Sequence, residues 1–257
     1  MQIRYFREYS HYLDRFMEFK MYGHAGKLCF VFPCQDGRFF EWEDRGMFEL
    51  VKDLIEEGRI QFCTVDSIDK ETWSSFGDTH HRMWLQECWV QYIMEELVPS
   101  ALWKAGLPQD EKCMTLGASM GGTHAANLFF RFPDRFDKVL GISGVYDMNE
   151  YFHGVYDDNC YNNDPCAYLA GMDPSHPYIQ KYNDSQIILT VGQGAWEDVC
   201  KNSLQKLSKI LYEKGIHAWI DFWGYDVNHD WPWWEVMLRY FLQIGRASCR
   251  ERVFVPV

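Results

Sequence analysis

The stretch GASMGG at residues 117–122 decides the fold, and Ser119 lies at the centre of its G-x-S-x-G pattern. A short apolar run, CMTL at residues 113–116, precedes it, and a helical pattern at residues 121–132 follows and ends before a proline. This order is typical of a nucleophile elbow, a strained strand-to-helix turn that exposes a reactive serine. The glycines on either side of the serine leave the room that such a turn needs, and the start of the next helix favours negative charge.

Outward from this turn, short apolar runs alternate with helical patterns. The runs that predict buried strands lie at residues 28–32, 60–65, 138–142, 187–191 and 218–223. The helical patterns lie at residues 48–57, 80–97, 196–214 and 231–243, and the second of them is expected to stop before Pro99. Residues 12–22 alternate between apolar and polar and predict an edge strand or hairpin. The alternation of strands and helices predicts an α/β fold with a mostly parallel central sheet flanked by helices.

The composition indicates a single domain over residues 1–243. A chain of 257 residues, 47% of them hydrophobic and 17% aromatic, buries a sizeable core and is not disordered. The net charge of -12 argues against binding to nucleic acid or to anionic lipid, because both require a basic face. No apolar run approaches the roughly 20 residues of a membrane span. A homo-oligomer is compatible with the sequence, which does not determine the quaternary state.

The cysteines and the N-terminal residues indicate the compartment. The first 15 residues are charged and aromatic, without the apolar stretch of a secretory signal peptide. Nine cysteines, an odd number, and the lack of a C-x-x-C motif favour reduced thiols. We therefore expect a cytoplasmic protein.

The last residues differ from the rest of the chain. The stretch IGRASCRERV at residues 244–253 matches the translation of a common sequencing adapter, so residues 244–257 are predicted to be a non-native tail and are left out of the fold prediction. A genuine short basic tail is the alternative. If the tail is not native, the sequence leaves open whether a natural C-terminal segment is missing.

Candidates for a catalytic base and for an acid that holds it lie in the sequence just after two of the predicted strands. A nucleophilic serine needs a base, and the base is held by a third group. Glu197 and Asp198 follow the apolar run IILTV, and His229 follows AWIDFW. Because ligands of parallel sheets bind at the carboxyl ends of the strands, we expect these side chains near Ser119. Glu197 is the preferred acid, and Asp198 is the alternative; one of them is expected to be only a first-turn helix carboxylate.

An oxyanion hole needs two N–H donors. The N–H of Met120, directly after the serine, is the first candidate. The second is expected in the loop PCQDGR, which follows the apolar run LCFVF, and is the N–H of Gly37 or Arg38. A plain surface turn is the alternative interpretation of this loop.

Residues 146–184 form a long insertion that is rich in tyrosine, and it is predicted to cover the serine as a lid. Tyr151 and Tyr156 are candidates to bind an aryl or sugar group; the alternative is an aromatic core that packs the insertion on itself. Trp231, close to the histidine, is a third substrate-binding candidate, with anchoring of the last helix as the alternative.

We expect no metal and no cofactor. The acidic residues of the insertion lack the spacing and the glycine of an EF-hand loop. Cys160, Cys166 and His153 lack the spacing of a metal site.

Three segments together carry a resemblance to a known family: GASMGGTHAANLFFRFPDRFDKVLGISGVYD, GQGAWED and GYDVNHDWPWW. They resemble the Putative esterase family of α/β-hydrolases, which includes esterase D (S-formylglutathione hydrolase), feruloyl esterases and mycolyltransferases. The resemblance extends over about residues 3–243 and implies an α/β-hydrolase fold with Ser119 as nucleophile and His229 as base. Many members carry an aspartate where this chain has Ala195; Glu197 and Asp198 lie slightly later, closer to the arrangement of the mycolyltransferases.

Residues and resemblance together predict a serine hydrolase that cleaves a small-molecule carboxylic ester through a Ser-His-acid triad and an acyl-enzyme. One alternative is an acyltransferase that passes the acyl group to an alcohol. Another is a non-catalytic protein that uses the same fold to bind carbohydrate or a protein partner.

Overall fold

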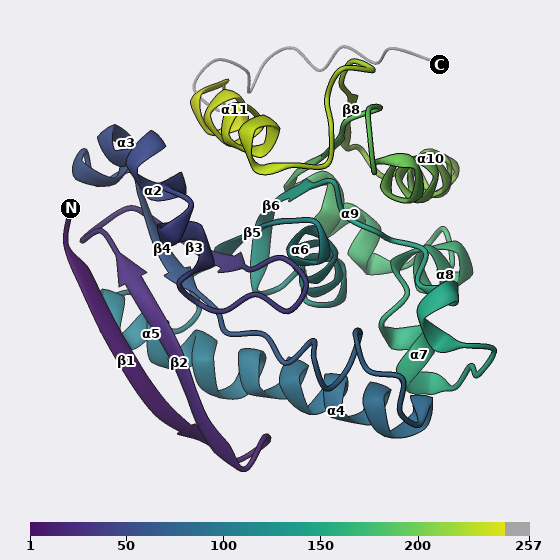
Figure 1. Ribbon diagram of the computed structural model, residues 1–257, viewed down its shortest axis with the longest axis horizontal. Coiled ribbons are helices and arrows are strands. Elements are labelled where there is room, and N and C mark those ends of the chain that lie inside the picture. Colours follow the sequence, from purple (N-terminus) through teal and green to yellow (C-terminus); the bar gives the residue numbers. More distant parts are fainter. Residues whose placement is uncertain (245–257) are drawn as a thin grey trace.

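The computed structural model describes residues 1–244, so the predicted non-native tail lies outside the described residues except for its first position. Eight strands form one sheet in the order β1-β2-β4-β3-β5-β6-β7-β8 (Figure 1). Their bounds are β1 (Ile3–Ser10), β2 (Arg15–Tyr22), β3 (Lys27–Phe32), β4 (Ile60–Thr64), β5 (Cys113–Ala118), β6 (Phe136–Ile142), β7 (Gln186–Val191) and β8 (Trp219–Phe222). Strands β3 to β8 are parallel, whereas β1 and β2 form an antiparallel hairpin that joins the sheet through β4.

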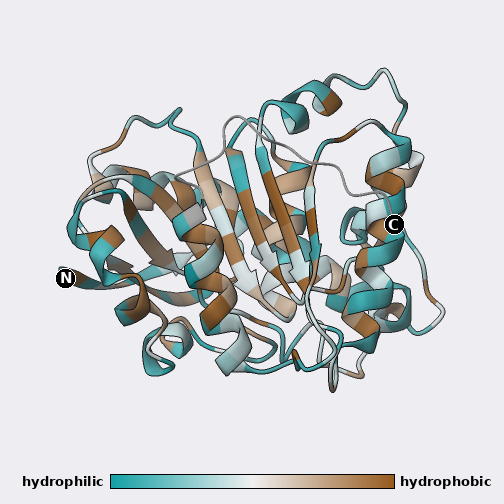
Figure 2. Ribbon diagram, turned by 90° about the horizontal axis from the view of Figure 1, so that it is seen from above, coloured by the Kyte–Doolittle hydropathy of each residue, from teal (hydrophilic) through white to brown (hydrophobic). Residues whose placement is uncertain are grey.

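Helices cover both faces of the sheet. Their bounds are α1 (Glu41–Asp44), α2 (Met47–Leu50), α3 (Lys52–Glu56), α4 (Thr79–Gln91), η1 (Tyr92–Leu97), α5 (Val98–Ala105), α6 (Met120–Arg131), η2 (Asn149–Phe152), α7 (Asp158–Asn162), α8 (Pro165–Gly171), α9 (Pro177–Asn183), α10 (Asp198–Glu213) and α11 (Trp231–Ile244). One core lies under α4, α5, α6, α8 and α10, and a second lies under α1, α2, α3 and α11. Figure 2 shows hydrophobic residues concentrated in the central strands, as a sheet covered on both faces requires.

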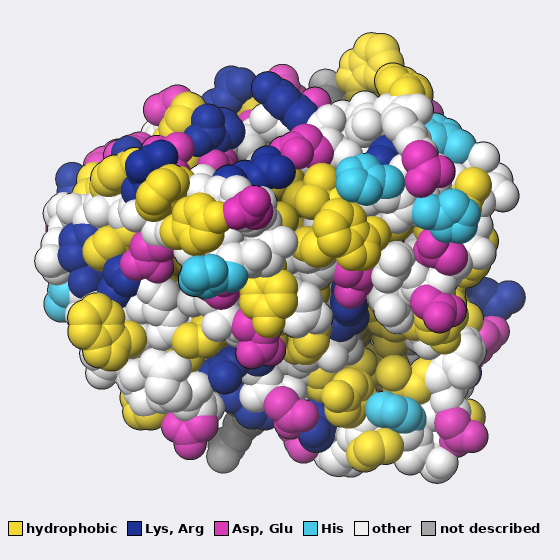
Figure 3. Space-filling view, turned by 90° about the horizontal axis from the view of Figure 1, so that it is seen from below, with side chains coloured by type: hydrophobic (Ala, Val, Ile, Leu, Met, Phe, Trp, Pro, Cys, Tyr) yellow, Lys and Arg dark blue, Asp and Glu magenta, His cyan; other side chains and the backbone are white. Residues whose placement is uncertain are grey.

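This arrangement is the predicted α/β-hydrolase architecture. The central strands β3, β5, β6 and β7 are almost entirely buried, which explains their continuous apolar sequences. No helix in the described part of the chain is long and apolar enough to cross a membrane. On the face shown in Figure 3, acidic and basic side chains are interspersed with hydrophobic ones.

Three element boundaries differ from the sequence prediction. The N-terminal hairpin begins at Ile3, earlier than predicted. Its first strand lies at the edge of the sheet and only Ser10 in it is buried, so burial imposes no apolar pattern on its sequence. The predicted helix at residues 48–57 is interrupted at Val51, which has φ -119° and ψ 19°. The helix that starts at Thr79 continues beyond Pro99. A π-helical turn, η1, precedes this residue, and Pro99 lies in the first turn of α5.

The insertion at residues 146–184 is helical and packs on the helical layer that contains α6 and α10. Helix α8 contacts α6 and α10, and α7 contacts α4. Tyr146 and Tyr182 are fully buried, and the Tyr182 hydroxyl donates to the carbonyl oxygen of Phe130 on α6. The buried tyrosines of the insertion therefore pack into the core shared with α6, and its action as a lid stays a prediction.

Candidate active site

Ser119 lies in a strained turn between β5 and α6. Its backbone has φ 56° and ψ -129°, a conformation that costs an L-residue energy. A Cβ on Gly117 would lie 2.1 Å from the carbonyl oxygen of Gly121, and a Cβ on Gly121 would lie 2.3 Å from that of Phe32. Only glycine therefore lets α6 start this close to β5 and β3, and the serine is held at the carboxyl edge of the sheet.

Two other loops bring His229 to Ser119 and Glu197 to His229. The Nε2 atom of His229 lies 2.9 Å from the Oγ atom of Ser119. The Nδ1 atom of the same ring lies 3.1 Å from Oε2 of Glu197. A continuous hydrogen-bonded chain thus connects a serine, a histidine and a carboxylate, with the serine partly exposed and the carboxylate buried.

Backbone bonds fasten the two loops to each other. The His229 N–H donates to the carbonyl oxygen of Ala195 at 2.9 Å, and the Gly194 N–H donates to that of Val227 at 2.8 Å. Asn228 accepts a bond from the Ala195 N–H at 2.8 Å. The loop that carries the histidine is therefore positioned by the loop that carries the acid.

The carboxylate of Glu197 has a second, buried set of partners. Its Oε1 atom accepts a bond from the hydroxyl of Ser143 at 2.6 Å and faces the Gly192 N–H at 3.4 Å. The Nε1–H of Trp234 in turn donates to the Ser143 hydroxyl at 3.2 Å, and the Trp234 ring lies edge-on to His229. These donors fix Oε1, which leaves Oε2 to face the histidine.

Asp198, the alternative acid, points elsewhere. Its side chain is 81% exposed and pairs with Lys201 at 2.8 Å in the first turn of α10. The structure therefore brings Glu197, and not Asp198, to His229.

A buried histidine lies on the helix that follows the serine, whereas His229 is half-buried. The Nε2 atom of His124 lies 3.0 Å from Oδ1 of Asp69, and both side chains are buried. His124 packs against Trp89 with 4.8 Å between ring centroids. Its ring is thus occupied in a structural pair, which leaves His229 as the histidine bonded to Ser119.

The candidate oxyanion donors lie at the start of α6 and in the loop after β3. Met120 is the first residue of α6, so its N–H belongs to the unpaired first turn of a helix. The loop after β3 begins against the elbow, since the carbonyl oxygens of Phe32 and Pro33 would lie 2.3 and 2.5 Å from a Cβ on Gly121. The Gly37 N–H donates to the carbonyl oxygen of Cys34 at 2.9 Å, so it must break this hydrogen bond before it can donate to an oxyanion.

Arg38, the other candidate in this loop, has its guanidinium engaged on the neighbouring strands. It bonds Glu18 of β2 and Asp66 after β4, each at 2.7 Å. Only its backbone N–H remains a candidate donor, as the sequence analysis proposed.

The three predicted substrate-binding residues have different surroundings. The ring of Tyr151 lies edge-on to Trp73 at 5.8 Å, and burial raises the pKa of its hydroxyl. Tyr156 is 49% exposed and lies edge-on to Phe152. The ring of Trp231 is buried and contacts those of Trp42 and Trp234, with 6.1 and 5.1 Å between ring centroids. Its packing is that of an anchor for α11.

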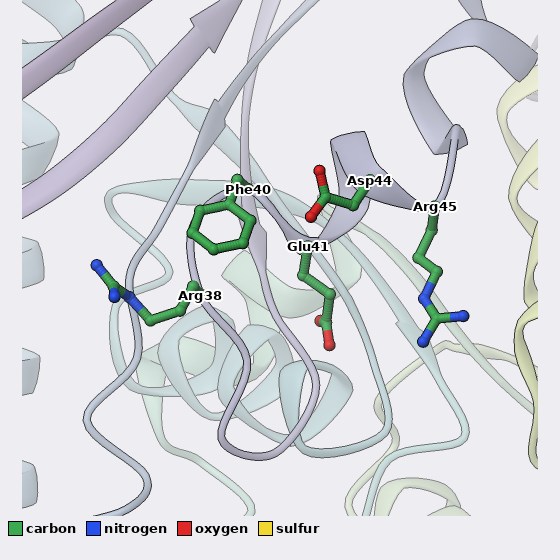
Figure 4. Close-up of a pocket in the computed structure, with 5 residues that line it drawn as sticks. All are labelled: Arg38, Phe40, Glu41, Asp44 and Arg45. Carbon is green, nitrogen blue, oxygen red and sulfur yellow. The ribbon is translucent and has the colours of Figure 1, made fainter.

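A pocket of about 390 Å³ lies beside this end of the sheet and is lined by Arg38, Phe40, Glu41, Asp44 and Arg45 (Figure 4). Burial raises the pKa of Glu41, whose Oε2 accepts a bond from the Cys34 N–H at 2.7 Å. The Arg45 guanidinium lies 5.1 Å from the ring centroid of Trp231, at the start of α11. The pocket is therefore lined by side chains of both charges from the loop after β3 and from α1.

Two residues of the site, Ser143 and Trp234, were missed by the sequence analysis. Ser143 directly follows β6, and its position after a central strand is the signal that could have identified it. Trp234 reaches Ser143 from α11, a contact 91 residues apart in the sequence that no local pattern marks.

Solved structures of low sequence identity share this fold. A ferulic acid esterase is 14% identical, with a TM-score of 0.71 over 94% of this chain and 95% of that one. S-formylglutathione hydrolase from Agrobacterium tumefaciens is 12% identical, with a TM-score of 0.70 over 94% and 93%. A fluorophosphonate-binding serine hydrolase from Staphylococcus aureus is 11% identical, with a TM-score of 0.68 over 94% and 97%.

Comparison with curated proteins found no match. The family model described as Putative esterase, in contrast, matches residues 10–241, which is nearly the whole described chain. The match includes Ser119, Glu197 and His229. The chain therefore belongs to the Putative esterase family and is an α/β-hydrolase of the carboxylic ester hydrolase class.

Proposed function

We propose that this esterase uses Ser119 as nucleophile, His229 as general base and Glu197 as the acid that orients the base. The observation that carries the proposal is the hydrogen-bonded chain from the Ser119 hydroxyl to the buried carboxylate, with links of 2.9 and 3.1 Å. Both distances are within the reach that proton transfer requires.

The chemistry follows from the direction of these bonds. A negative carboxylate at Nδ1 keeps the proton of the neutral imidazole on that nitrogen, so Nε2 is free to accept the Ser119 proton. The serine oxygen then attacks the ester carbonyl, the alcohol leaves with a proton from His229, and water hydrolyses the resulting acyl-enzyme through the same base. The Met120 N–H and a donor from the loop at residues 33–38 would stabilise the oxyanion.

The substrate is proposed to be a small-molecule ester and the location the cytoplasm. All eight cysteines of the described chain are free thiols, which supports a reducing compartment.

The test compares wild type with Ser119→Ala on short p-nitrophenyl esters. We expect wild type to turn over and the variant to lose at least about a thousandfold in kcat, because the covalent step is removed. The control is Ser175→Ala, since Ser175 hydrogen-bonds locally to Asp173 and is exposed. Equal rates for Ser119→Ala and wild type would overturn the proposal.

A further inference from the structure

One cysteine lies beside the proposed triad without belonging to it. Cys200 is three residues after Glu197, is buried on α10, and has its Sγ atom 3.9 Å from Nδ1 of His229. Oε2 of Glu197 lies 3.1 Å from the same nitrogen. The ligand atoms of all three residues lie within 4.8 Å of one another. A carboxylate, an imidazole nitrogen and a thiol thus face one small volume.

We propose that Glu197, Cys200 and His229 bind a thiophilic divalent cation, Zn²⁺ in the cell, and that the bound cation reversibly inhibits the enzyme. Cation binding is independent of the proposed function, whereas inhibition rests on it. The site requires no new backbone position, because its three ligands are already assembled.

The distances fit a tetrahedral ion. Zinc bond lengths of about 2.0–2.1 Å to nitrogen or oxygen and about 2.3 Å to sulfur place neighbouring N and O ligands about 3.4 Å apart, and N and S ligands about 3.6 Å apart. The corresponding distances in the protein are 3.1 and 3.9 Å. These two separations differ from the tetrahedral values by about 0.3 Å, and the carboxylate oxygen lies within 4.8 Å of Sγ, so side-chain adjustment brings the three ligands onto one ion.

Charge and outer contacts also favour the ion. A carboxylate and a thiolate together balance the charge of a divalent cation, which offsets the cost of burying it. Ser143 and Gly192 hold Oε1 of Glu197 and so direct Oε2 at the site, as the outer partners of metal ligands commonly do. Burial, together with the charge of Glu197, raises the pKa of the Cys200 thiol, so the cation must displace a proton from sulfur when it binds.

Inhibition follows from the tautomer of His229. In the active form the ring proton lies on Nδ1 and Nε2 accepts from Ser119. A cation bound at Nδ1 leaves the neutral ring with its proton on Nε2. That nitrogen can then donate to the serine oxygen but cannot accept its proton. The bound ion therefore stops the first step of catalysis without touching the serine.

The experiment compares wild type with Cys200→Ser, and uses Cys88→Ser, a half-buried cysteine on α4, as the matched control. Zn²⁺ binding is measured by calorimetry, Cd²⁺ binding by the ultraviolet absorption of the cadmium–thiolate bond, and ester hydrolysis across a Zn²⁺ titration. We expect one ion per chain in wild type and Cys88→Ser, with hydrolysis lost in parallel and restored by a chelator. Cys200→Ser should hydrolyse at the wild-type rate without cation, and its affinity should fall about a hundredfold as one ligand is lost.

Two results would overturn the cation site: no binding to wild type, or binding and thiolate absorption that persist unchanged in Cys200→Ser. Cation binding that depends on Cys200 but leaves hydrolysis intact would refute the inhibition. If wild type binds the ion through Cys200 and hydrolyses no ester, the site stands and the proposed function fails, so the two outcomes are distinguishable.

Discussion

Replacing Glu197 by glutamine should abolish most of the activity through the tautomer of His229. The hydroxyl of Ser143 and the N–H of Gly192 both donate toward Oε1, so the amide oxygen of a glutamine must occupy that position. Its NH₂ group then takes the place of Oε2, 3.1 Å from Nδ1 of His229. Because NH₂ can only donate there, Nδ1 must accept, and the ring proton moves to Nε2, where it blocks proton transfer from Ser119.

The expected loss in kcat is about 10⁴-fold, the cost of placing the wrong tautomer in a comparable triad, which corresponds to about 5.5 kcal/mol in activation free energy. Fold and substrate binding should be preserved, since glutamine has the size of glutamate. Steady-state hydrolysis of a p-nitrophenyl ester gives kcat, and circular dichroism checks the fold.

Asp198→Asn is the matched control, because Asp198 is the neighbouring carboxylate, 81% exposed and paired only with Lys201. It should keep kcat within about twofold of wild type, as expected for a surface substitution. A Glu197→Gln variant that is folded and within tenfold of wild type would refute the reasoning, as would an Asp198→Asn variant that loses activity instead.

Three further predictions follow from the same geometry. Ser143→Ala removes a charge-assisted bond to Glu197, so kcat should fall about 10- to 100-fold with KM little changed, in steady-state assays; an unchanged kcat would show that the acid needs no such support. In denaturant titrations, Gly121→Ala should lower the free energy of unfolding by about 3 kcal/mol or more, because its Cβ would lie 2.3 Å from a backbone oxygen. The control Gly77→Ala should be near neutral, because its Cβ would meet only a flexible side chain. Equal stabilities of the two variants would contradict the close packing at the serine turn. Burial raises the pKa of Asp164 to about 6, so the folded protein binds the proton of this carboxyl more tightly than the unfolded chain does, and the stability gained from that proton is lost as pH rises from about 4 to 6. In thermal melts over this range, Asp164→Asn should therefore become more stable relative to wild type as pH rises. A difference in melting temperature that stays constant with pH would argue against a raised pKa of Asp164.

Much of the fold could be predicted because the signals are local. The central strands are continuous apolar runs, and the serine turn combines a motif with the strand and helix that it requires. The first strand of the hairpin was missed because only Ser10 of its eight residues is buried, so no apolar pattern marks it. The helix beyond Pro99 was missed because a proline is a stop signal unless a π-helical turn precedes it.

In the candidate site, too, some features are marked by local sequence signals and others are not. The placement of Ser119 and His229 follows from strand ends and chain order, which the sequence displays. The choice between Glu197 and Asp198 depends on which of the two side chains points toward His229 at the start of α10. Because the two residues are adjacent, the sequence does not reveal that direction. The contact of Cys200 with His229 joins helix α10 to the loop that carries the histidine. It was not visible as a metal-ligand spacing, because only Glu197 and Cys200 of the three proposed ligands are close in sequence.

The most direct test of the proposed triad is the mass of the protein after reaction with a fluorophosphonate. Wild type should gain one adduct per chain, and peptide mapping should place it on Ser119. Ser119→Ala should gain none, and Glu197→Gln should react far more slowly than Asp198→Asn. Labelling on another residue, or labelling of Ser119→Ala at the wild-type rate, would contradict the assignment of Ser119 as the nucleophile.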